Sequence, residues 1–340
     1  MIERLLLFCV CALSGSAAAQ PARLPEALEV LRQSLEPPKA AYSAELALLR
    51  PEGKAGGSRS QRVRLFFSPP GLYRRELLGP SGEVRQVIVE DGRSEWVYDS
   101  ARCKIWQGEP ADPLFKRFGP DEEFDRLRVN YELSLATGAP VAGRATWLLE
   151  LRGRSGAALA RRFWVDRQSF IVLRGETFRQ DGTWAGSAVY DRLQLGAAPD
   201  PELFHFSPPA GSTVVRRGAP DYLALDETKA ASGIEPRLPA WLPSGYVFES
   251  LDVIPKGQRN VVHYRFSDGV DALSLFQCPP HMRFDLGRAP RAQVRLSVGR
   301  GYRTESSEGN VLVWNSGGEH FILVGSVSYD VLRRVAESVP

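Results

Sequence analysis

The sequence predicts an α+β fold that is mostly antiparallel β, arranged as a larger domain followed by a smaller one. Apolar and polar residues alternate with a period of two in many short segments, such as 163–165 and 170–173, which is typical of half-buried strands. Turn-forming pairs such as Asp181-Gly182 separate these segments, because Asp-Gly supplies the positive φ angles of tight hairpins. A chain of 340 residues with 43% hydrophobic residues can bury one large core or two smaller ones, and we expect two.

The first residues have the pattern of a secretory signal peptide. An apolar run at 5–13 follows a short start with one positive side chain, and small residues at 16–19 precede Gln20. The run is too short to span a bilayer, and a buried N-terminal helix is the alternative. We therefore expect residues 1–19 to be cleaved and the exported protein to begin near Gln20.

The larger domain is predicted to begin with a helix and to continue as a meander. Leucines in segment 25–35 share one face, and Pro37 ends the helix. Alternating segments with short, turn-rich links predict consecutive strands at 42–50, 61–68, 72–78, 83–90 and 94–98. Residues 110–135 break this alternation and predict one or two short helices that cover the open side of a curved sheet. Strands resume near Trp147 and continue to about Leu195.

A change of composition separates the smaller domain from the larger one. Residues 211–238 contain several Pro, Gly and Arg with little alternation, which predicts a linker. Alternation then predicts strands at 246–254, 261–267, 272–276, 294–298, 302–306, 311–315 and 320–326, with a closing helix at 329–339. The predicted organisation is a signal peptide at 1–19, a larger domain at 20–210, a linker at 211–238 and a smaller α+β domain at 239–340.

The charge pattern argues against nucleic acid as a partner. The formal net charge is only +3, and Arg is spread along the chain in pairs such as Arg161-Arg162. Nucleic-acid binding usually shows clustered Lys and Arg together with a recognisable module. Such pairs are usually solvated and protect strand edges, while a weak attraction to anionic lipid or to an acidic partner stays open.

The sequence lacks the motifs of catalytic and metal sites. The four histidines are His205, His263, His281 and His320. No His-Glu-x-x-His helix, Gly-x-Ser-x-Gly elbow or phosphate-binding glycine loop accompanies them. Cys278 and His281 have a ligand-like spacing, but a closed zinc site needs four ligands and no second pair lies nearby. We predict that the protein is not an enzyme and holds no cofactor or metal.

Cleavage of the signal peptide would leave two cysteines, Cys103 and Cys278. They could form one bridge between the two halves of the protein, or stay unpaired in separate buried places, because sequence does not give the distance between them. Their presence in an exported protein motivates the hypothesis that they are bridged.

Several features between Trp164 and Gly211 resemble the lipoprotein-carrier fold. They are the Trp164-Val165-Asp166 strand start, the return through Ile171-Val172-Leu173-Arg174, the Asp181-Gly182 turn and the Phe204-x-Phe206-x-Pro208-Pro209-x-Gly211 ending. That fold is an unclosed half-barrel of antiparallel strands covered by helices. The resemblance implies this architecture for the larger domain.

The smaller domain resembles the C-terminal domain of the MucB/RseB periplasmic sigma-factor regulators. The resemblance rests on Leu242-Pro243-x-Gly245-Tyr246, His263-Tyr264-x-x-Ser267-Asp268-Gly269 and Leu273-Ser274-Leu275-Phe276. It implies a periplasmic protein that binds a membrane anti-sigma factor and protects it from proteolysis until an envelope-stress ligand displaces it. It also implies that a homo-oligomer could form. A carrier of lipid or lipoprotein, and an accessory envelope protein without a ligand, are the alternatives.

The same resemblance implies that the half-barrel accommodates acyl chains, so aromatic residues on its strands are candidates for contact with them. Burial of a ligand there would contribute about 25 cal/mol per Å², although aromatic residues on alternating strands commonly form core instead. The acyl candidates are Tyr73, Trp96, Tyr98, Trp106, Trp164, Trp184 and Tyr190. The candidates for a partner-binding surface, which could also be packing or turn residues, are Tyr246, His263, Tyr264 and Asp268.

Overall fold

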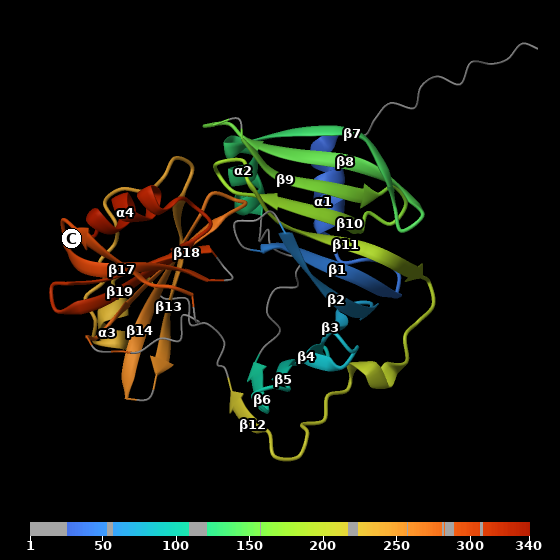
Figure 1. The fold of residues 1–340 in the computed structure, drawn as a ribbon, viewed down its shortest axis with the longest axis horizontal. Coiled ribbons are helices and arrows are strands. Elements are labelled where there is room, and N and C mark those ends of the chain that lie inside the picture. The colour runs from blue at the N-terminus through green and yellow to red at the C-terminus, as the bar shows by residue number, and fades with distance from the viewer. Residues whose placement is uncertain are drawn as a thin grey trace, which may run out of the picture.

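The fold is α+β and mostly antiparallel β, as predicted, and its strands form two separate sheets (Figure 1). The computed structural model describes residues 26–52, 57–108, 121–156, 158–216, 224–256, 258–280, 282, 289–306 and 309–340. The predicted signal peptide at 1–19 lies outside these ranges. Within them, no helix is both long and apolar enough to cross a membrane.

The first sheet has twelve strands and is an unclosed half-barrel. Its strands are β1 (Tyr42–Glu52), β2 (Gly57–Ser68), β3 (Leu72–Leu78), β4 (Val84–Glu90), β5 (Glu95–Asp99), β6 (Lys104–Gly108), β7 (Tyr131–Val141), β8 (Arg144–Gly153), β9 (Leu159–Asp166), β10 (Val172–Phe178), β11 (Trp184–Leu195) and β12 (Thr213–Arg216). They lie in the order β12-β6-β5-β4-β3-β2-β1-β11-β10-β9-β8-β7. Only β12 runs parallel to its neighbour, β6.

The alternation of side chains gives this sheet two different faces. Helices α1 (Ala27–Leu35) and α2 (Asp121–Asn130) lie against β7 and β8 on one of them, which we call the helix face. Leu31 and Leu127 from the helices are buried there against Leu149 and Leu151. We call the other side the opposite face, and the strand register decides to which face each residue belongs.

The predicted helical region at 110–135 is helical only in part. Residues 109–120 lie outside the described ranges, and Asp121–Asn130 form α2. The prediction is wrong for 131–135, which begin β7. Tyr131, Leu133 and Leu135 alternate with polar residues and pack in the core under the helices. This period of two forms a strand, although the charged residues before it belong to a helix.

The hairpin between β9 and β10 is fixed by the buried carboxylate of Asp166. This group accepts hydrogen bonds from the backbone N–H of Ser169 at 2.9 Å, from its hydroxyl at 2.6 Å and from Arg144 Nη2 at 2.8 Å. Burial alone would raise the pKa of Asp166, but these hydrogen bonds outweigh it and lower that pKa. The turn therefore holds a charged group that fixes the position of the strand carrying Trp164.

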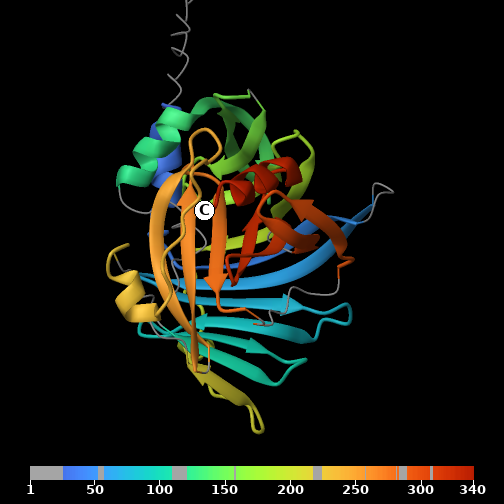
Figure 2. The ribbon, with the colours of Figure 1, turned by 90° about the vertical axis from the view of Figure 1, so that its left-hand side faces the viewer.

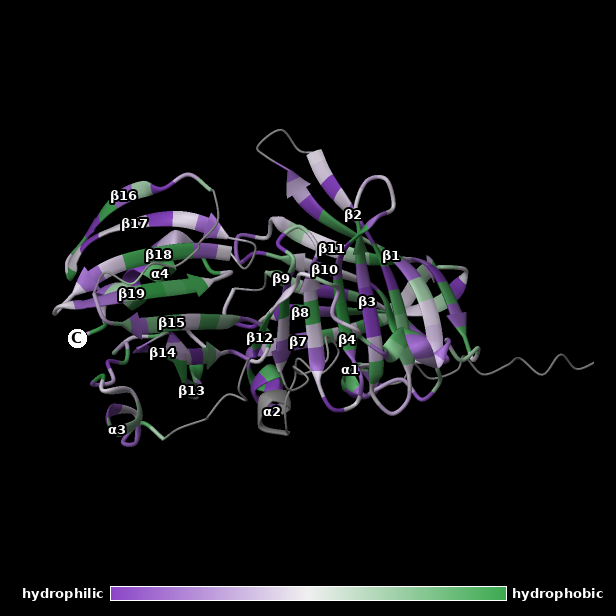
Figure 3. Cartoon of the chain, turned by 90° about the horizontal axis from the view of Figure 1, so that it is seen from below, coloured by the Kyte–Doolittle hydropathy of each residue, from purple (hydrophilic) through white to green (hydrophobic). Residues whose placement is uncertain are grey.

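The second sheet has seven antiparallel strands and a core on each face. Its strands are β13 (Val247–Lys256), β14 (Arg259–Ser267), β15 (Ala272–Cys278), β16 (Ala292–Leu296), β17 (Gly299–Ser306), β18 (Gly309–Ser316) and β19 (Glu319–Gly325), in the order β13-β14-β15-β19-β18-β17-β16. Helix α4 (Tyr329–Glu337) packs on one face, over the large core around Trp314. Val313 and Ile322 belong to a smaller cluster on the other face. Figure 2 views the molecule from the side of this sheet, and Figure 3 shows the apolar colour of β18 and β19.

The predicted linker at 211–238 contains regular structure. Its first part forms β12, which extends the first sheet by pairing with β6, and its later part contains the short helix α3 (Thr228–Ser232), which packs on β14. Just before the predicted linker, the 3-10 helix η1 (Pro201–Phe204) contacts β3. Both ends of this connection are therefore attached to a sheet. The domain boundaries themselves stay a prediction.

Candidate functional site

The strand register distributes the seven aromatic candidates over both faces of the first sheet. Residues paired across neighbouring strands share one face of the sheet. Tyr42 pairs with Phe67 and Phe67 with Tyr73, so Tyr73 lies on the helix face. Trp106 lies on the same face. Tyr190, opposite Leu46, also lies there. The four on the opposite face are Trp96, Tyr98, Trp164 and Trp184. One concave cavity therefore cannot be lined by all seven residues.

The tyrosines of the helix face form packed core. Tyr42 and Tyr73 are buried, and the Tyr42 ring stacks on Phe67 with centroids 5.5 Å apart. Desolvation raises the pKa of both hydroxyls well above the usual value. An acyl chain would contact these rings only after the segments that bury them had moved.

Two candidates of the opposite face, Trp96 and Tyr98, are covered by the segment that follows η1. Phe206 lies 5.6 Å from the ring of Trp96 and 6.1 Å from that of Tyr98. Arg74 Nη1 donates to the backbone carbonyl of Leu203 at 3.1 Å, which attaches η1 to β3. The Phe-x-Phe ending noted in the sequence therefore packs on β5 and fixes the position of this segment.

Trp164 lies within a chain of ion pairs on the opposite face. The guanidinium of Arg174 lies 4.3 Å from its ring centroid and that of Arg162 5.8 Å. Arg162 pairs with Glu150 at 2.7 Å and with Glu176 at 3.4 Å. With only 8% of its surface exposed, Trp164 supports the sheet and offers little surface to a ligand.

Trp184 differs from the other candidates because it borders a hollow. This hollow has a volume of about 390 Å³, within the range of small-ligand sites. It is lined by Leu49, Pro51, Gly57, Ser58, Arg174, Glu176, Trp184 and Ser187. Arg174 Nη2 pairs with Glu176 at 2.5 Å, while its buried Nε has no hydrogen-bond partner among the described residues. The site combines apolar surface from Leu49 and Pro51 with the guanidinium of Arg174, which is paired with Glu176.

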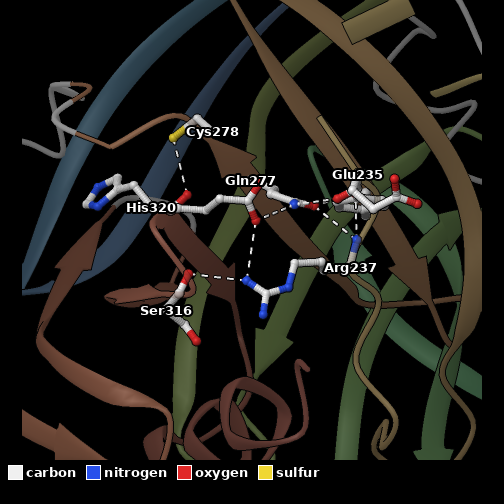
Figure 4. A network of polar contacts seen from close by, with 8 residues as sticks. Glu235, Arg237, Gln277, Cys278, Ser316 and His320 are labelled. Atoms are coloured by element: carbon white, nitrogen blue, oxygen red, sulfur yellow. Dashed lines mark hydrogen bonds and ion pairs between the residues drawn. The ribbon is translucent and has the colours of Figure 1, made fainter. Parts of the chain in front are cut away.

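Among the partner candidates, Tyr264 belongs to a buried polar network in the second sheet. Figure 4 shows Glu235, Arg237 and Gln277 of this network. The Tyr264 hydroxyl donates to Gln277 Oε1 at 2.6 Å, and the backbone N–H of Arg237 donates to the same oxygen at 3.1 Å. Gln277 Nε2 donates to the Glu235 carbonyl at 2.8 Å and to Glu319 at 2.7 Å. The network ties the end of the predicted linker to β15 and β19, which is a structural role.

His263 is held on the other face of the same sheet. Its Nδ1 lies 2.9 Å from an Asp252 oxygen and its Nε2 3.1 Å from the Ser274 hydroxyl. Its ring stacks on Phe276 with centroids 4.4 Å apart. Both ring nitrogens thus have partners within the sheet.

Asp268 lies at the contact between the two sheets, in the turn from β14 to β15. Its Oδ2 accepts a 2.7 Å hydrogen bond from the hydroxyl of Tyr131 on β7. Asn130 Nδ2 donates to the carbonyls of Asp268 at 2.8 Å and of Gly245 at 3.0 Å. Arg161 pairs with Asp271 in the same turn. We call this set of residues the seam.

The seam is both polar and apolar. Val270, at the tip of the turn, packs against the core under α1 and α2 that contains Leu127 and Tyr131. Tyr246 is buried beside the seam, and its hydroxyl has no hydrogen-bond partner among the described residues. Burial raises the pKa of Asp268 although its hydrogen bonds from the backbone and from Tyr131 act to lower it. The turn is therefore the part of the second sheet that contacts the helix-covered core of the first.

Sequence reasoning selected Asp268 and Tyr246 but missed their partners in the first sheet. Asn130, Tyr131 and Arg161 carry no motif, and their importance depends on contacts between residues more than 100 positions apart. The Ser-Asp-Gly turn at 267–269 was the only sequence signal of this contact.

The hypothesis of a bridge between Cys103 and Cys278 is wrong in this structure, because both cysteines are free. Cys103 is exposed in the turn before β6. Cys278 is buried at the end of β15, where its thiol contacts the His320 carbonyl at 3.3 Å. Burial raises the pKa of Cys278 to about 11.

Among the described residues no group of three or more His, Cys, Asp or Glu could hold a metal ion. His281, the second member of the Cys278-x-x-His281 spacing, lies outside those residues.

Comparisons with known proteins find a family model that matches part of the chain and solved structures whose fold is similar over most of it. Residues 74–204 match the family model of the MucB/RseB N-terminal domain. This match confirms the resemblance to that family, and it does so through the larger domain. A search of curated proteins found no match. Among solved structures, the complex of MucA and MucB from Pseudomonas aeruginosa is 19% identical with a TM-score of 0.58, and the alignment covers 93% of this chain and 99% of that one.

Two further MucB structures are similar over the same extent. MucB in complex with MucA(peri) is 20% identical with a TM-score of 0.57, over 92% of this chain and 97% of the other. MucB alone is 20% identical with a TM-score of 0.52, over 92% and 96%. At this identity the likeness establishes the fold of both sheets.

Proposed function

Because the chain carries a MucB/RseB N-terminal domain over residues 74–204, we propose that it is a periplasmic envelope-stress regulator which binds the periplasmic part of a membrane anti-sigma factor. The observation that carries the proposal is the likeness of nearly the whole chain to MucB in complex with MucA. A carrier needs only the half-barrel, whereas this chain has a second sheet attached to it by the seam.

The proposal includes export through cleavage of residues 1–19. The apolar run and the small residues before Gln20 support it. The N-terminal sequence of protein purified from the periplasm tests this step, and a chain that retains Met1 would contradict it.

The finer part of the proposal is a sensor for acyl chains in the half-barrel, with Trp184 as the contact residue. The hollow beside Trp184 supports it, because Leu49 and Pro51 offer apolar surface beside the partly exposed guanidinium of Arg174. Tyr73, Trp96, Tyr98 and Trp164 are covered or buried as described above, so an acyl chain would meet them only after rearrangement, whereas Trp106 and Tyr190 are half-buried on the helix face.

Partner capture followed by titration tests the regulator. Residues 20–340 serve as bait in native envelope extracts, and bound proteins and lipids are identified together by mass spectrometry. We expect one single-pass membrane protein with a cytoplasmic sigma-factor-binding region, and saturable binding of its purified periplasmic segment. A titration of that segment to high concentration without signal would remove the proposal. Recovery of lipoproteins or acyl lipids alone would favour a carrier instead.

Uptake of a fluorescent fatty acid tests the sensor. We expect Trp184→Glu to lower uptake while the circular dichroism of the protein stays unchanged, because Trp184 borders a hollow. Trp106→Glu, on the helix face of β6, is the matched control and should retain uptake. Trp164→Glu should destabilise the sheet, since its ring is nearly buried between two arginines. Unchanged uptake by a folded Trp184→Glu protein would contradict the sensor at this hollow.

A further inference from the structure

One surface of the second sheet has a strong charge that nothing above uses. Strand β16 is the outermost strand of the second sheet, so no strand of the described residues pairs with its outer edge (Figure 3). Along β16 the side chains alternate: Val294 and Leu296 pack into the core beneath α4, whereas Gln293 and Arg295 point to the other side of the sheet.

Arginines gather on that other side. Arg295 stands directly opposite Arg300 of β17, and both are exposed. Gln293 stands opposite Tyr302, and the Arg291 guanidinium lies 5.0 Å from the centroid of the Tyr302 ring. We call Arg291, Gln293, Arg295, Arg300 and Tyr302 the arginine face.

The arginine face lacks negative charge from the part of the chain that the structure describes. Arg291, Arg295 and Arg300 form no ion pair with any described residue. Many other arginines of the protein do have a carboxylate partner, as Arg265 and Arg333 have in this same domain. The nearby Glu337 is engaged on the α4 side, by Arg333 and by the backbone N–H of Ser297.

A like-charged pair placed directly across two strands destabilises a sheet. Charged side chains protect an edge from unwanted pairing, but arginines that stand directly opposite each other also repel each other. A ligand that supplies carboxylates would turn this repulsion into attraction. An extended peptide would in addition pair its backbone with the free edge of β16, which a lipid headgroup cannot do.

We propose that the arginine face and the free edge of β16 bind an acidic, extended peptide segment, added as a strand beside β16. Acidic side chains at alternate positions of that segment meet Arg295 and Arg300, and its backbone hydrogen bonds extend the sheet. The proposal does not depend on the identity of the protein that supplies the segment.

The probe is a labelled synthetic peptide in which glutamate alternates with valine, titrated into the full chain and followed by fluorescence anisotropy. We expect saturable binding that weakens at high salt. In the variant Arg295→Gln/Arg300→Gln we expect affinity to fall about fivefold to tenfold. This variant removes exposed like charges, so it should keep its fold, which circular dichroism checks.

Matched controls separate charge from strand addition. Arg50 and Arg59 also oppose each other and are exposed, but they lie at the end of the β1–β2 hairpin in the first sheet, away from β16. Arg50→Gln/Arg59→Gln removes the same charge and should bind the peptide as the natural protein does. The peptide with glutamine in place of glutamate, and the peptide N-methylated at alternate backbone amides, should both bind weakly.

Three results would overturn the proposal. They are equal loss of affinity in both double variants, full binding of the N-methylated peptide, and binding to vesicles containing phosphatidylglycerol without binding to the peptide. The first would mean that only overall charge acts, the second that no strand is added, and the third that the surface faces a membrane.

Discussion

The hydroxyl of Tyr131 donates a 2.7 Å hydrogen bond to the carboxylate of Asp268, which joins the first strand after α2 to the turn between β14 and β15. Both residues are buried. Tyr131 also belongs to the core beneath α1 and α2, so a movement of these helices would reach the second sheet through this pair. The helix-covered core of the first sheet and the turn between β14 and β15 of the second sheet are therefore connected through identifiable atoms.

Tyr131→Phe should weaken the seam without disturbing either sheet. The change leaves a buried carboxylate oxygen without its donor, which costs about 1–3 kcal/mol. We expect lower stability in denaturant and faster amide hydrogen exchange at 267–271. Tyr98→Phe is the control, because no described residue accepts a hydrogen bond from that hydroxyl. Equal stability of the Tyr131→Phe and Tyr98→Phe proteins would contradict the role of the pair.

The seam should also give stability a particular pH dependence. Burial raises the folded-state pKa of Asp268 above its unfolded value, so the folded protein binds more protons between these two values. Stability contributed by this group is therefore greatest below the unfolded pKa, near 4, and falls as pH rises through the folded pKa. Tyr131, Asp271 and Tyr246 interact with Asp268, and Arg161 faces the same turn through its ion pair with Asp271.

The measurement is the difference in unfolding free energy between the natural protein and Asp268→Asn as pH is varied. Carboxylates with lowered pKa values, such as Asp166, act in the opposite direction in both proteins and cancel in the difference. We expect the natural protein to lose stability relative to the variant as pH rises through the window above pH 4. A difference that is constant with pH would rule out a raised pKa at Asp268.

Gly245→Ala tests how closely the sheets approach at the seam. Gly245 has a φ of +87°, and a Cβ there would lie 2.7 Å from Asn130 Oδ1. Gly182 has a φ of +79° with nothing within 4 Å of such a Cβ, so Gly182→Ala measures backbone strain alone, about 1–2 kcal/mol. We expect Gly245→Ala to cost more, and the excess to disappear in an Asn130→Ala background. If Gly245→Ala cost as much as Gly182→Ala, with or without Asn130→Ala, the side chain of Asn130 would be able to move aside at no cost in stability.

Alternation and turn chemistry were enough to predict the strands and the fold class, because local period and burial agree along most of the chain. They failed at Lys104–Gly108, which forms β6 although no strand was predicted there. They also failed at 131–135, where charged residues of α2 lie next to a strand, and at Thr213–Arg216, where a short parallel strand depends on a distant neighbour, β6. A four-residue edge strand carries too little alternation to be recognised.

The candidate residues illustrate a different limit. Sequence correctly identifies Trp164 and Trp184 as strand aromatics, but their surroundings depend on register and on bulges such as the one between Thr177 and Phe178. One shift of register exchanges the faces of a strand. Sequence therefore could not separate a ring packed between Arg162 and Arg174 from a ring beside a hollow, nor find the contact of Tyr131 with Asp268.

The two free cysteines should react very differently with a thiol reagent. Cys103 is exposed, whereas Cys278 is buried and desolvation raises its pKa to about 11, so at neutral pH little of it is the reactive thiolate. We expect one equivalent of rapid labelling in the native protein and two after unfolding, both without reductant. Cys103→Ser should abolish the rapid phase and Cys278→Ser should leave it unchanged. Absence of labelling in unfolded, unreduced protein would instead reveal a bridge and contradict the separation of these residues.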